Sequence, residues 1–112
     1  MRKLFSFPIL YTYTIFIIVM SVIPVDAKGV EFIPFYDKIT HFLIYIILAF
    51  LAINTFRLSF KGKFYFKAFI YCFLLGAILE CAQYFLPYRT FELLDILANS
   101  LGAILGIFIK IP

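Results

Sequence analysis

The residues of this chain best suited to chemistry are polar side chains placed at helical spacing within long apolar stretches. In one stretch Asp37, His41 and Tyr45 recur every fourth position, which sets them in a single stripe along a helix. Lys38 stands about a quarter turn away from that stripe. A carboxylate, an imidazole and a cation in this arrangement are suited to acid–base catalysis or to binding a polar, charged ligand.

Two later stretches carry similar polar faces. They are Gly76, Glu80 and Gln83 in the first, and Asp95, Asn99, Gly102 and Gly106, within about 60° of arc, in the second. Counted from the helix ends on one side at about 1.5 Å per residue, His41 lies about 6 Å deep, Glu80 about 9 Å and Asn99 about 12 Å. All three stretches therefore place these groups in the same half of the molecule, and we expect the other half to be apolar with a basic collar.

Long apolar stretches of this kind are typical of membrane-spanning helices, and an ionisable side chain that faces lipid costs roughly several kcal/mol. These polar groups are therefore expected to meet in one site. The predicted ligand-binding residues are Asp37, Lys38, His41, Tyr45, Glu80, Gln83, Arg89, Asp95 and Asn99. Glu80 and His41 are the candidates for a catalytic acid or base. No nucleophile, metal-ligand set or cofactor motif accompanies them, so the catalytic residues stay undetermined.

Simpler interpretations of several of these residues stay open. Gly102 and Gly106, like Gly76, are typical of a close helix-packing face. Asp37 also fits a helix N-cap, and Lys38 and Arg89 fit anchors at a membrane interface. Asn99 also fits a hydrogen bond between helices, and His41 a satisfied interior residue. Glu80 is the hardest to explain structurally, because a carboxylate among apolar neighbours needs a specific partner.

Composition predicts the fold class. Of 112 residues, 65% are hydrophobic and 14% charged, too little polar material to cover a soluble protein of this size. We therefore expect an all-α protein, an integral membrane bundle of four transmembrane helices at about residues 4–25, 37–57, 64–86 and 91–110. The length leaves room for a single domain, residues 1–112.

Loop charges predict the orientation of this bundle. Seven Lys and Arg residues fall at the termini and around Gly62, against three on the opposite side, so both termini are expected in the cytoplasm. The polar cluster then faces the extracytoplasmic side. A cleaved signal peptide is the competing interpretation of the first apolar stretch, but that stretch is longer than a signal core of about 7–15 residues.

Other partners and cofactors are not expected. The net charge of +4 comes from basic residues in loops beside apolar stretches, where they meet lipid headgroups rather than nucleic acid. Cys72 and Cys81 lie about 13 Å apart along one helix, too far for a disulfide. No spacing typical of a metal site is present.

The spaced polar residues of 37–106 resemble those of the VanZ-like family of small bacterial membrane proteins. The motifs that carry the resemblance are Asp37-Lys38-x-x-His41-Phe42-x-x-Tyr45, Gly76-x-x-x-Glu80-x-x-Gln83, and Arg89 followed by Asp95, Asn99, Gly102 and Gly106. The sequence departs from the pattern at Cys81, where a bulky apolar residue is expected, and in its short loops. The resemblance implies a location in the bacterial cytoplasmic membrane and a link, as in the namesake, to low-level resistance to the glycopeptide teicoplanin.

Three hypotheses of function follow. The first is a protein that binds or modulates an envelope lipid, a lipid-linked cell-wall precursor or a lipoglycopeptide through the polar cluster. The second is an intramembrane enzyme that uses Glu80 or His41 as acid or base on a lipid-linked substrate. The third is a carrier for a small solute or proton, which four short helices would form only as a homo-oligomer.

Overall fold

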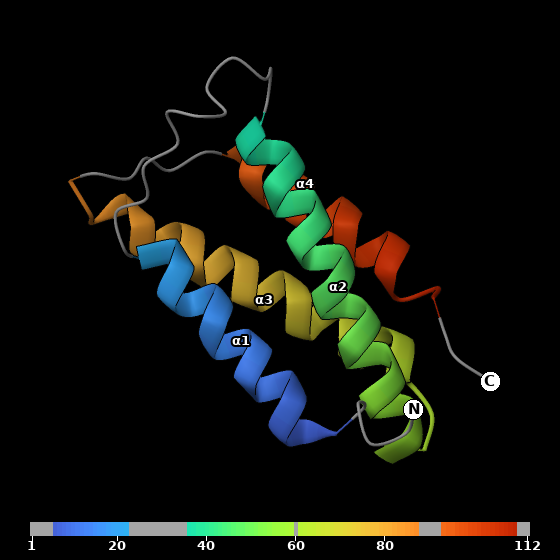
Figure 1. The fold of residues 1–112 in the computed structure, drawn as a ribbon. Helices are drawn as coiled ribbons and strands as arrows, with labels where there is room; N and C mark the ends of the chain where they lie inside the picture. Colours follow the sequence, from blue (N-terminus) through green and yellow to red (C-terminus); the bar gives the residue numbers. More distant parts are fainter. Residues whose placement is uncertain (1–5, 23–35, 60, 88–92, 110–112) are drawn as a thin grey trace.

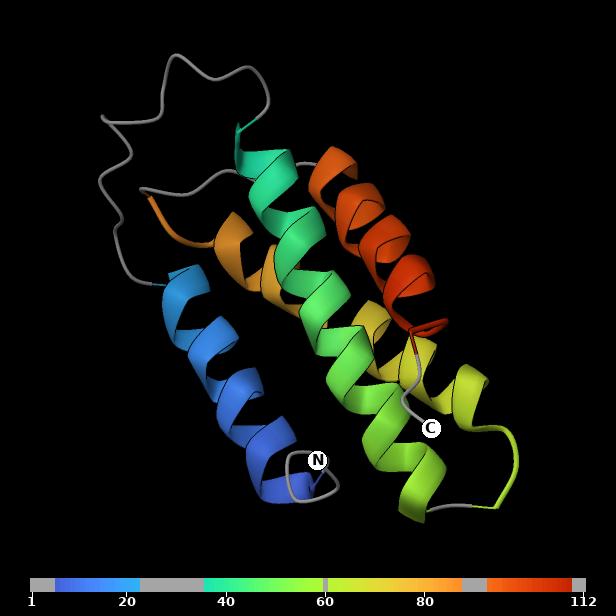
Figure 2. The same ribbon diagram turned by 45° about the vertical axis from the view of Figure 1, so that its right-hand side comes forward.

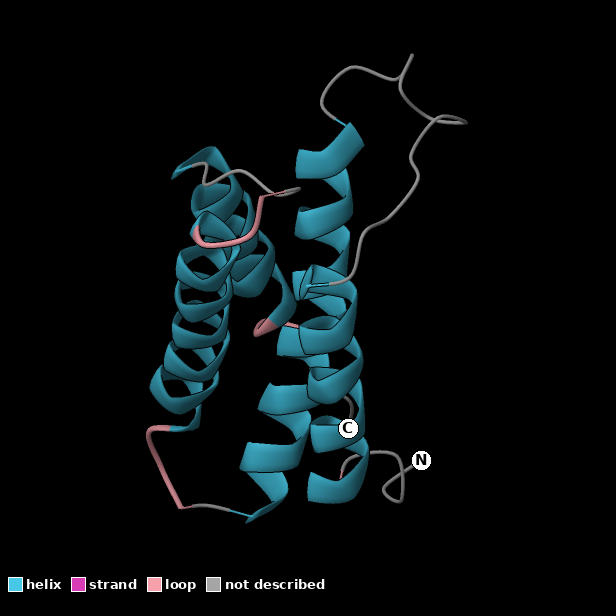
Figure 3. Cartoon of the chain, turned by 90° about the vertical axis from the view of Figure 1, so that its left-hand side faces the viewer, coloured by secondary structure: helices cyan, strands magenta, loops and turns pink. Residues whose placement is uncertain are grey.

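The computed structural model of the protein describes residues 6–22, 36–59, 61–87 and 93–109. These residues form four α-helices: α1 (Phe7–Val22), α2 (Tyr36–Ser59), α3 (Phe64–Tyr84) and α4 (Leu93–Gly106). Figure 3 shows helices and turns, with no strand among the described residues. The all-α prediction is confirmed. α2 and α3 agree with the predicted ranges 37–57 and 64–86 to within about two residues at each end, whereas the predicted helix ends at residues 4, 25, 91 and 110 lie outside the described residues.

The helix ends follow from local sequence. Pro8 sits in the first turn of α1, where its missing N–H costs no hydrogen bond. α3 ends at Tyr84, and the N–H groups of Phe85 and Leu86 close the last turn on the carbonyls of Ala82 and Gln83. α2 begins at Tyr36, so the sequence assignment of Asp37 as N-cap is corrected: Asp37 is a first-turn residue, because the helix starts one position earlier than expected.

α2 lies at the centre of the bundle (Figures 1 and 2). It packs most extensively on α4, while α3 contacts both α2 and α4. α1 lies at one side of the bundle and makes fewer contacts with α2 and α3 than these make with each other. The chain therefore forms a tight α2–α3–α4 core with a more loosely attached first helix.

Small residues set the distance between α2 and α4. A Cβ atom on Gly102 would overlap the backbone carbonyl of Phe42, and one on Gly106 would overlap that of Ile46 and lie 2.7 Å from the Cβ of Ala49. A backbone carbonyl in a helix cannot rotate away, so only glycine fits at these two positions. The two helices pack backbone against backbone, as small residues allow in membrane bundles.

The turn between α2 and α3 uses left-handed backbone geometry. Gly62 has φ 74°, which glycine adopts without a steric penalty. Lys63 follows with φ 55° and precedes α3 without a side-chain cap. This turn places Lys61 and Lys63 on the surface at the end of the bundle.

Large apolar side chains cover the outside of the helices. On α4 the exposed ones are Leu93, Leu94, Leu97, Leu101, Ile104 and Leu105. An apolar surface of this extent marks a contact with membrane or protein rather than water. Two helices, Lys38–Leu58 and Phe64–Tyr84, are long and apolar enough to cross a membrane, whereas α1 and α4 are apolar but shorter.

Candidate functional site

Lys38 and Asp95 form an ion pair between the N-terminal parts of α2 and α4. The Nζ of Lys38 lies 3.2 Å from Oδ1 of Asp95, and the two side chains are 19% and 9% exposed. Asp95 occupies the first turn of α4, where the helix dipole favours a negative charge. Two regions 57 positions apart in sequence are thus joined by opposite charges at the edge of the bundle interior.

His41 lies one helical turn beyond Lys38 and contacts two residues of α4. Its Nδ1 lies 3.0 Å from Oδ1 of Asn99, and its Nε2 lies 3.9 Å from Oδ2 of Asp95. The Asn99 oxygen can only accept a hydrogen bond, so Nδ1 carries the proton in this contact. Nε2 is then directed at the Asp95 carboxylate, which attracts the ring when it is protonated.

Asn99 also reaches α3. Its Nδ2 lies 2.9 Å from the position that a Cβ would take on Gly76, so the amide packs directly against the α3 backbone. Asn99 is 3% exposed. One buried side chain on α4 therefore contacts both α2 and α3, and glycine at position 76 makes the room for it.

Glu80 lies one turn beyond Gly76 on α3 and is fully buried, at 1% exposure. Tyr45 of α2 is also buried. A buried carboxylate requires polar or charged neighbours, because an isolated charge in an apolar interior is strongly unfavourable. Glu80 therefore belongs to the polar interior of the bundle rather than to its surface.

Gln83, which the sequence predicts as a ligand-binding residue, makes a contact with the first helix. Its Nε2 donates a 2.8 Å hydrogen bond to the backbone carbonyl of Ser21 in the last turn of α1. That carbonyl is one of the four that a helix end leaves without an internal partner. Gln83 therefore attaches α1 to α3.

Four of the nine residues predicted to bind a ligand are joined by direct contacts, and we name Lys38, His41, Asp95 and Asn99 the polar cluster. Tyr45 and Glu80 lie in the adjoining buried interior, and Gln83 is bonded to α1. Arg89 and the side chain of Asp37 lie outside the described residues.

The helix-packing glycines lie against neighbouring helices, Gly76 beside Asn99 and the other two beside α2. Among the described residues no three His, Cys, Asp or Glu side chains gather closely enough to hold a metal ion.

Sequence reasoning missed a second buried polar group at the opposite end of α2. Asn54 is fully buried and donates hydrogen bonds from Nδ2 to the carbonyls of Phe50, at 2.9 Å, and Ile109, at 3.0 Å. Arg57 donates to its Oδ1 at 3.5 Å. The expectation that the half of the bundle away from the polar cluster is apolar is therefore incorrect at Asn54. The signal was an amide within an apolar stretch, because a buried amide needs hydrogen-bond partners.

The VanZ/LLP1 family profile matches residues 4–111, nearly the whole chain. The chain belongs to the VanZ/LLP1 family. The resemblance found in the polar motifs is thereby confirmed.

A relative of this VanZ/LLP1 family member is an uncharacterized protein of the fission yeast Schizosaccharomyces pombe. It is 35% identical over 80 residues, which cover 70% of this chain and 49% of the yeast protein. The chain thus spans about half the length of the curated relative it matches. No solved structure matches the VanZ/LLP1 chain.

Proposed function

We propose that this VanZ/LLP1 protein is a membrane protein that binds the polar headgroup of an envelope lipid or lipoglycopeptide at the polar cluster. The observation that supports the proposal is the network of Lys38, His41, Asp95 and Asn99, largely buried between two helices whose outer faces are apolar. Such groups are costly within a bilayer and are kept where they serve a ligand or a pathway.

The proposal includes the orientation of the chain. α2 and α3 have the length and hydropathy for crossing, and α1 and α4 pack beside them with apolar outer faces. We propose that all four helices cross the bilayer. The excess of Lys and Arg at the termini and at Lys61 and Lys63 favours a cytoplasmic location for that end, with the polar cluster facing outward.

The chemistry of the polar cluster favours a ligand that carries both a negative charge and hydroxyl or amino groups. Lys38 supplies a compact positive charge of the kind that binds phosphate or carboxylate. Asp95, 3.2 Å away, accepts hydrogen bonds from hydroxyl or ammonium groups. An approaching headgroup of this mixed character exchanges the Lys38–Asp95 contact for two new ones, so neither charge is left unpaired.

Binding to defined probes tests the proposal. The protein in nanodiscs is titrated with undecaprenyl phosphate and, separately, with teicoplanin. We expect Asp95→Asn and Lys38→Gln to weaken binding of at least one probe by roughly tenfold or more, since a hydrogen bond to a charged group contributes about 1.5–3 kcal/mol. The matched control is Ser100→Ala, beside Asn99 on α4, whose hydroxyl donates to the Ile96 carbonyl within the same helix. Unchanged binding in the Asp95 and Lys38 variants would refute the site.

A second candidate, an acid–base enzyme acting on a lipid-linked substrate, is favoured by the orientation of His41. Its ring is fixed through Nδ1 by Asn99, and Nε2 lies 3.9 Å from Asp95, beyond hydrogen-bonding distance. A ring oriented through one nitrogen is the arrangement of a general base. Turnover of a labelled phospholipid or undecaprenyl-linked substrate that His41→Gln and Glu80→Gln abolish, with binding retained, would favour the enzyme over the binding protein.

A further inference from the structure

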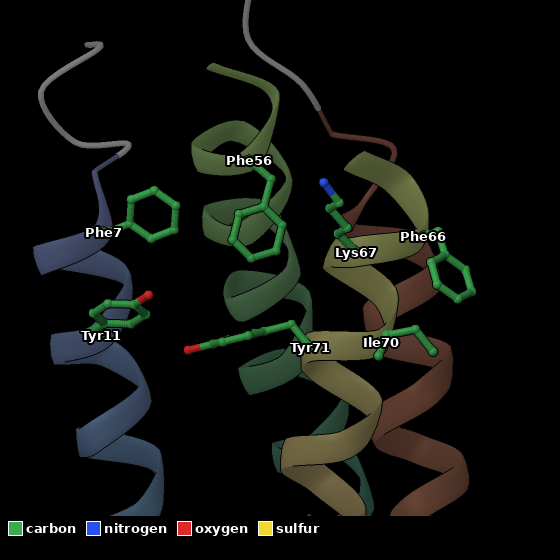
Figure 4. Close-up of a pocket in the computed structure, with 7 residues that line it drawn as sticks. All are labelled: Phe7, Tyr11, Phe56, Phe66, Lys67, Ile70 and Tyr71. Carbon is green, nitrogen blue, oxygen red and sulfur yellow. The ribbon is translucent and has the colours of Figure 1, made fainter. Parts of the chain in front are cut away.

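A groove lies at the end of the bundle opposite the polar cluster. It has a volume of about 370 Å³ and is lined by Phe7, Tyr11, Phe56, Phe66, Lys67, Ile70 and Tyr71. Figure 4 shows that these side chains come from α1, α2 and α3, with Tyr71 extending from α3 toward α1. Phe56 lies 15 positions beyond His41 on α2, so the groove and the polar cluster are separated by about 22 Å along that helix.

The walls of the groove are held in place by contacts among its aromatic rings. Phe56 packs edge-on against Tyr71 with ring centroids 5.8 Å apart, and Phe7 lies 6.0 Å from Phe56. The hydroxyl of Tyr71, one of the lining residues, is bonded to the Thr14 hydroxyl, which joins α3 to α1. The groove is thus a formed apolar surface rather than a gap left by loosely placed side chains.

The groove combines this apolar surface with a positive rim. Lys67 is the charged residue among its lining side chains, and it lies one turn into α3 from Lys63. Lys61 and Lys63 are exposed in the preceding turn. The volume lies in the range of pockets that hold small ligands, about 300–1,000 Å³. An occupant that fits has a long apolar part and a negative group at the bundle end.

We propose that the groove holds an acyl chain of an anionic membrane phospholipid whose phosphate lies beside Lys67. Phe66 and Tyr11 are 66% and 51% exposed, so the groove is open to the surrounding bilayer, and an acyl chain matches its aromatic and aliphatic walls. Basic residues near a membrane surface attract anionic lipids, which selects the headgroup. The proposal requires that the chain lies in a membrane but is independent of any ligand at the polar cluster.

Fluorescence quenching by brominated lipids tests this site. The chain contains no Trp, so Phe66→Trp places a single indole fluorophore at the edge of the groove with one aromatic replacing another. Leu101→Trp, on the exposed face of α4, reports the surrounding lipid. Each protein is reconstituted in phosphatidylcholine vesicles that contain the same fraction of brominated phosphatidylglycerol or brominated phosphatidylcholine.

We expect brominated phosphatidylglycerol to quench the Phe66→Trp fluorophore at least twofold more than brominated phosphatidylcholine does, and the Leu101→Trp fluorophore equally with both lipids. Adding Lys67→Gln to Phe66→Trp is expected to remove the difference. Lys61→Gln, which makes the same charge change outside the lining of the groove, is expected to leave most of it.

Three results would overturn the proposal. One is equal quenching of the Phe66→Trp fluorophore by the two lipids, which means that the groove does not select an anionic headgroup. Another is an equal effect of Lys67→Gln and Lys61→Gln, which means that the preference for the anionic lipid depends on the net charge of the protein and not on a contact with Lys67. The third is a Phe66→Trp fluorophore shielded from both lipids while Leu101→Trp is quenched, which means that protein, such as a second copy of the chain, fills the groove. Quenching of Leu101→Trp separately reports membrane insertion, so failure of the site is distinguishable from failure of insertion.

Discussion

His41 on α2 and Asn99 on α4 are joined through Nδ1 and Oδ1 at 3.0 Å, and the same Asn99 amide packs against Gly76 of α3. A single buried side chain therefore fixes the relative positions of three helices. This contact also sets the direction of the imidazole toward Asp95. The structural stability of the core and the geometry of the polar cluster depend on the same residue.

Replacement of Asn99 by Ala is expected to destabilise the bundle by about 1 kcal/mol, the scale of hydrogen bonds between helices in membrane proteins. The reason is the loss of the His41 hydrogen bond and of the packing on Gly76. Unfolding of the purified protein in detergent measures the change. Ser100→Ala, which removes a hydroxyl bonded within α4, is expected to change stability by less than about 0.5 kcal/mol. Equal stability of the two variants would contradict a structural role for Asn99.

Exchange of the charges at positions 38 and 95 in a double variant is expected to restore the ion pair that each single substitution removes. Lys38→Asp places two carboxylates together, and Asp95→Lys places two ammonium groups together, because the side chains now lie 3.2 Å apart. The double variant keeps one charge of each sign. We expect a coupling of about 1 kcal/mol between the two positions in a double-mutant cycle of unfolding free energies, at low salt. Additive effects of the two changes would show that the pair contributes no interaction.

Replacement of Gly102 by Ala is expected to destabilise the protein by roughly 1–3 kcal/mol, the usual cost of overpacking. The new methyl group would overlap the carbonyl of Phe42, which is part of the α2 backbone and has no alternative rotamer. Thermal unfolding in detergent measures the loss. Leu101→Ala, the adjacent exposed position, is the control and is expected to have a smaller effect. A Gly102→Ala protein as stable as the original would mean that α2 and α4 lie farther apart than described.

Two neighbouring buried residues of α2, Asn54 and Thr55, are expected to respond differently to substitution by an apolar residue. Asn54→Leu leaves the carbonyl of Ile109 without its donor, so stability falls by about 1–3 kcal/mol and the turn that follows α4 loosens. Thr55→Val is expected to be neutral or slightly stabilising, because the described residues offer its buried Oγ1 no hydrogen-bond partner. Unfolding in detergent and hydrogen exchange of the C-terminal peptide measure the two effects. Destabilisation by Thr55→Val as large as that by Asn54→Leu would contradict this assignment.

The sequence by itself determined that the protein is all-helical, where the helices lie and which polar residues share a helix face. Apolar stretches and Pro or Gly breaks are local signals, and the 3.6-residue period places Asp95 and Asn99 on one face whatever surrounds them. The motif spacing also indicated the VanZ-like family, which the match to residues 4–111 confirmed. These properties depend on neighbours within a few turns of the chain.

Only the tertiary structure decided which polar side chains meet. Gln83 bonds the Ser21 carbonyl of α1 and not the polar cluster, and Asn54 bonds the Ile109 carbonyl beyond α4, at the opposite end of the bundle. The rotation of one helix against another depends on close packing between distant residues, here the approach of Gly102 to the Phe42 carbonyl. Helical spacing fixes the direction in which a side chain leaves its own helix. The residue that it contacts depends on how the neighbouring helices pack against that helix.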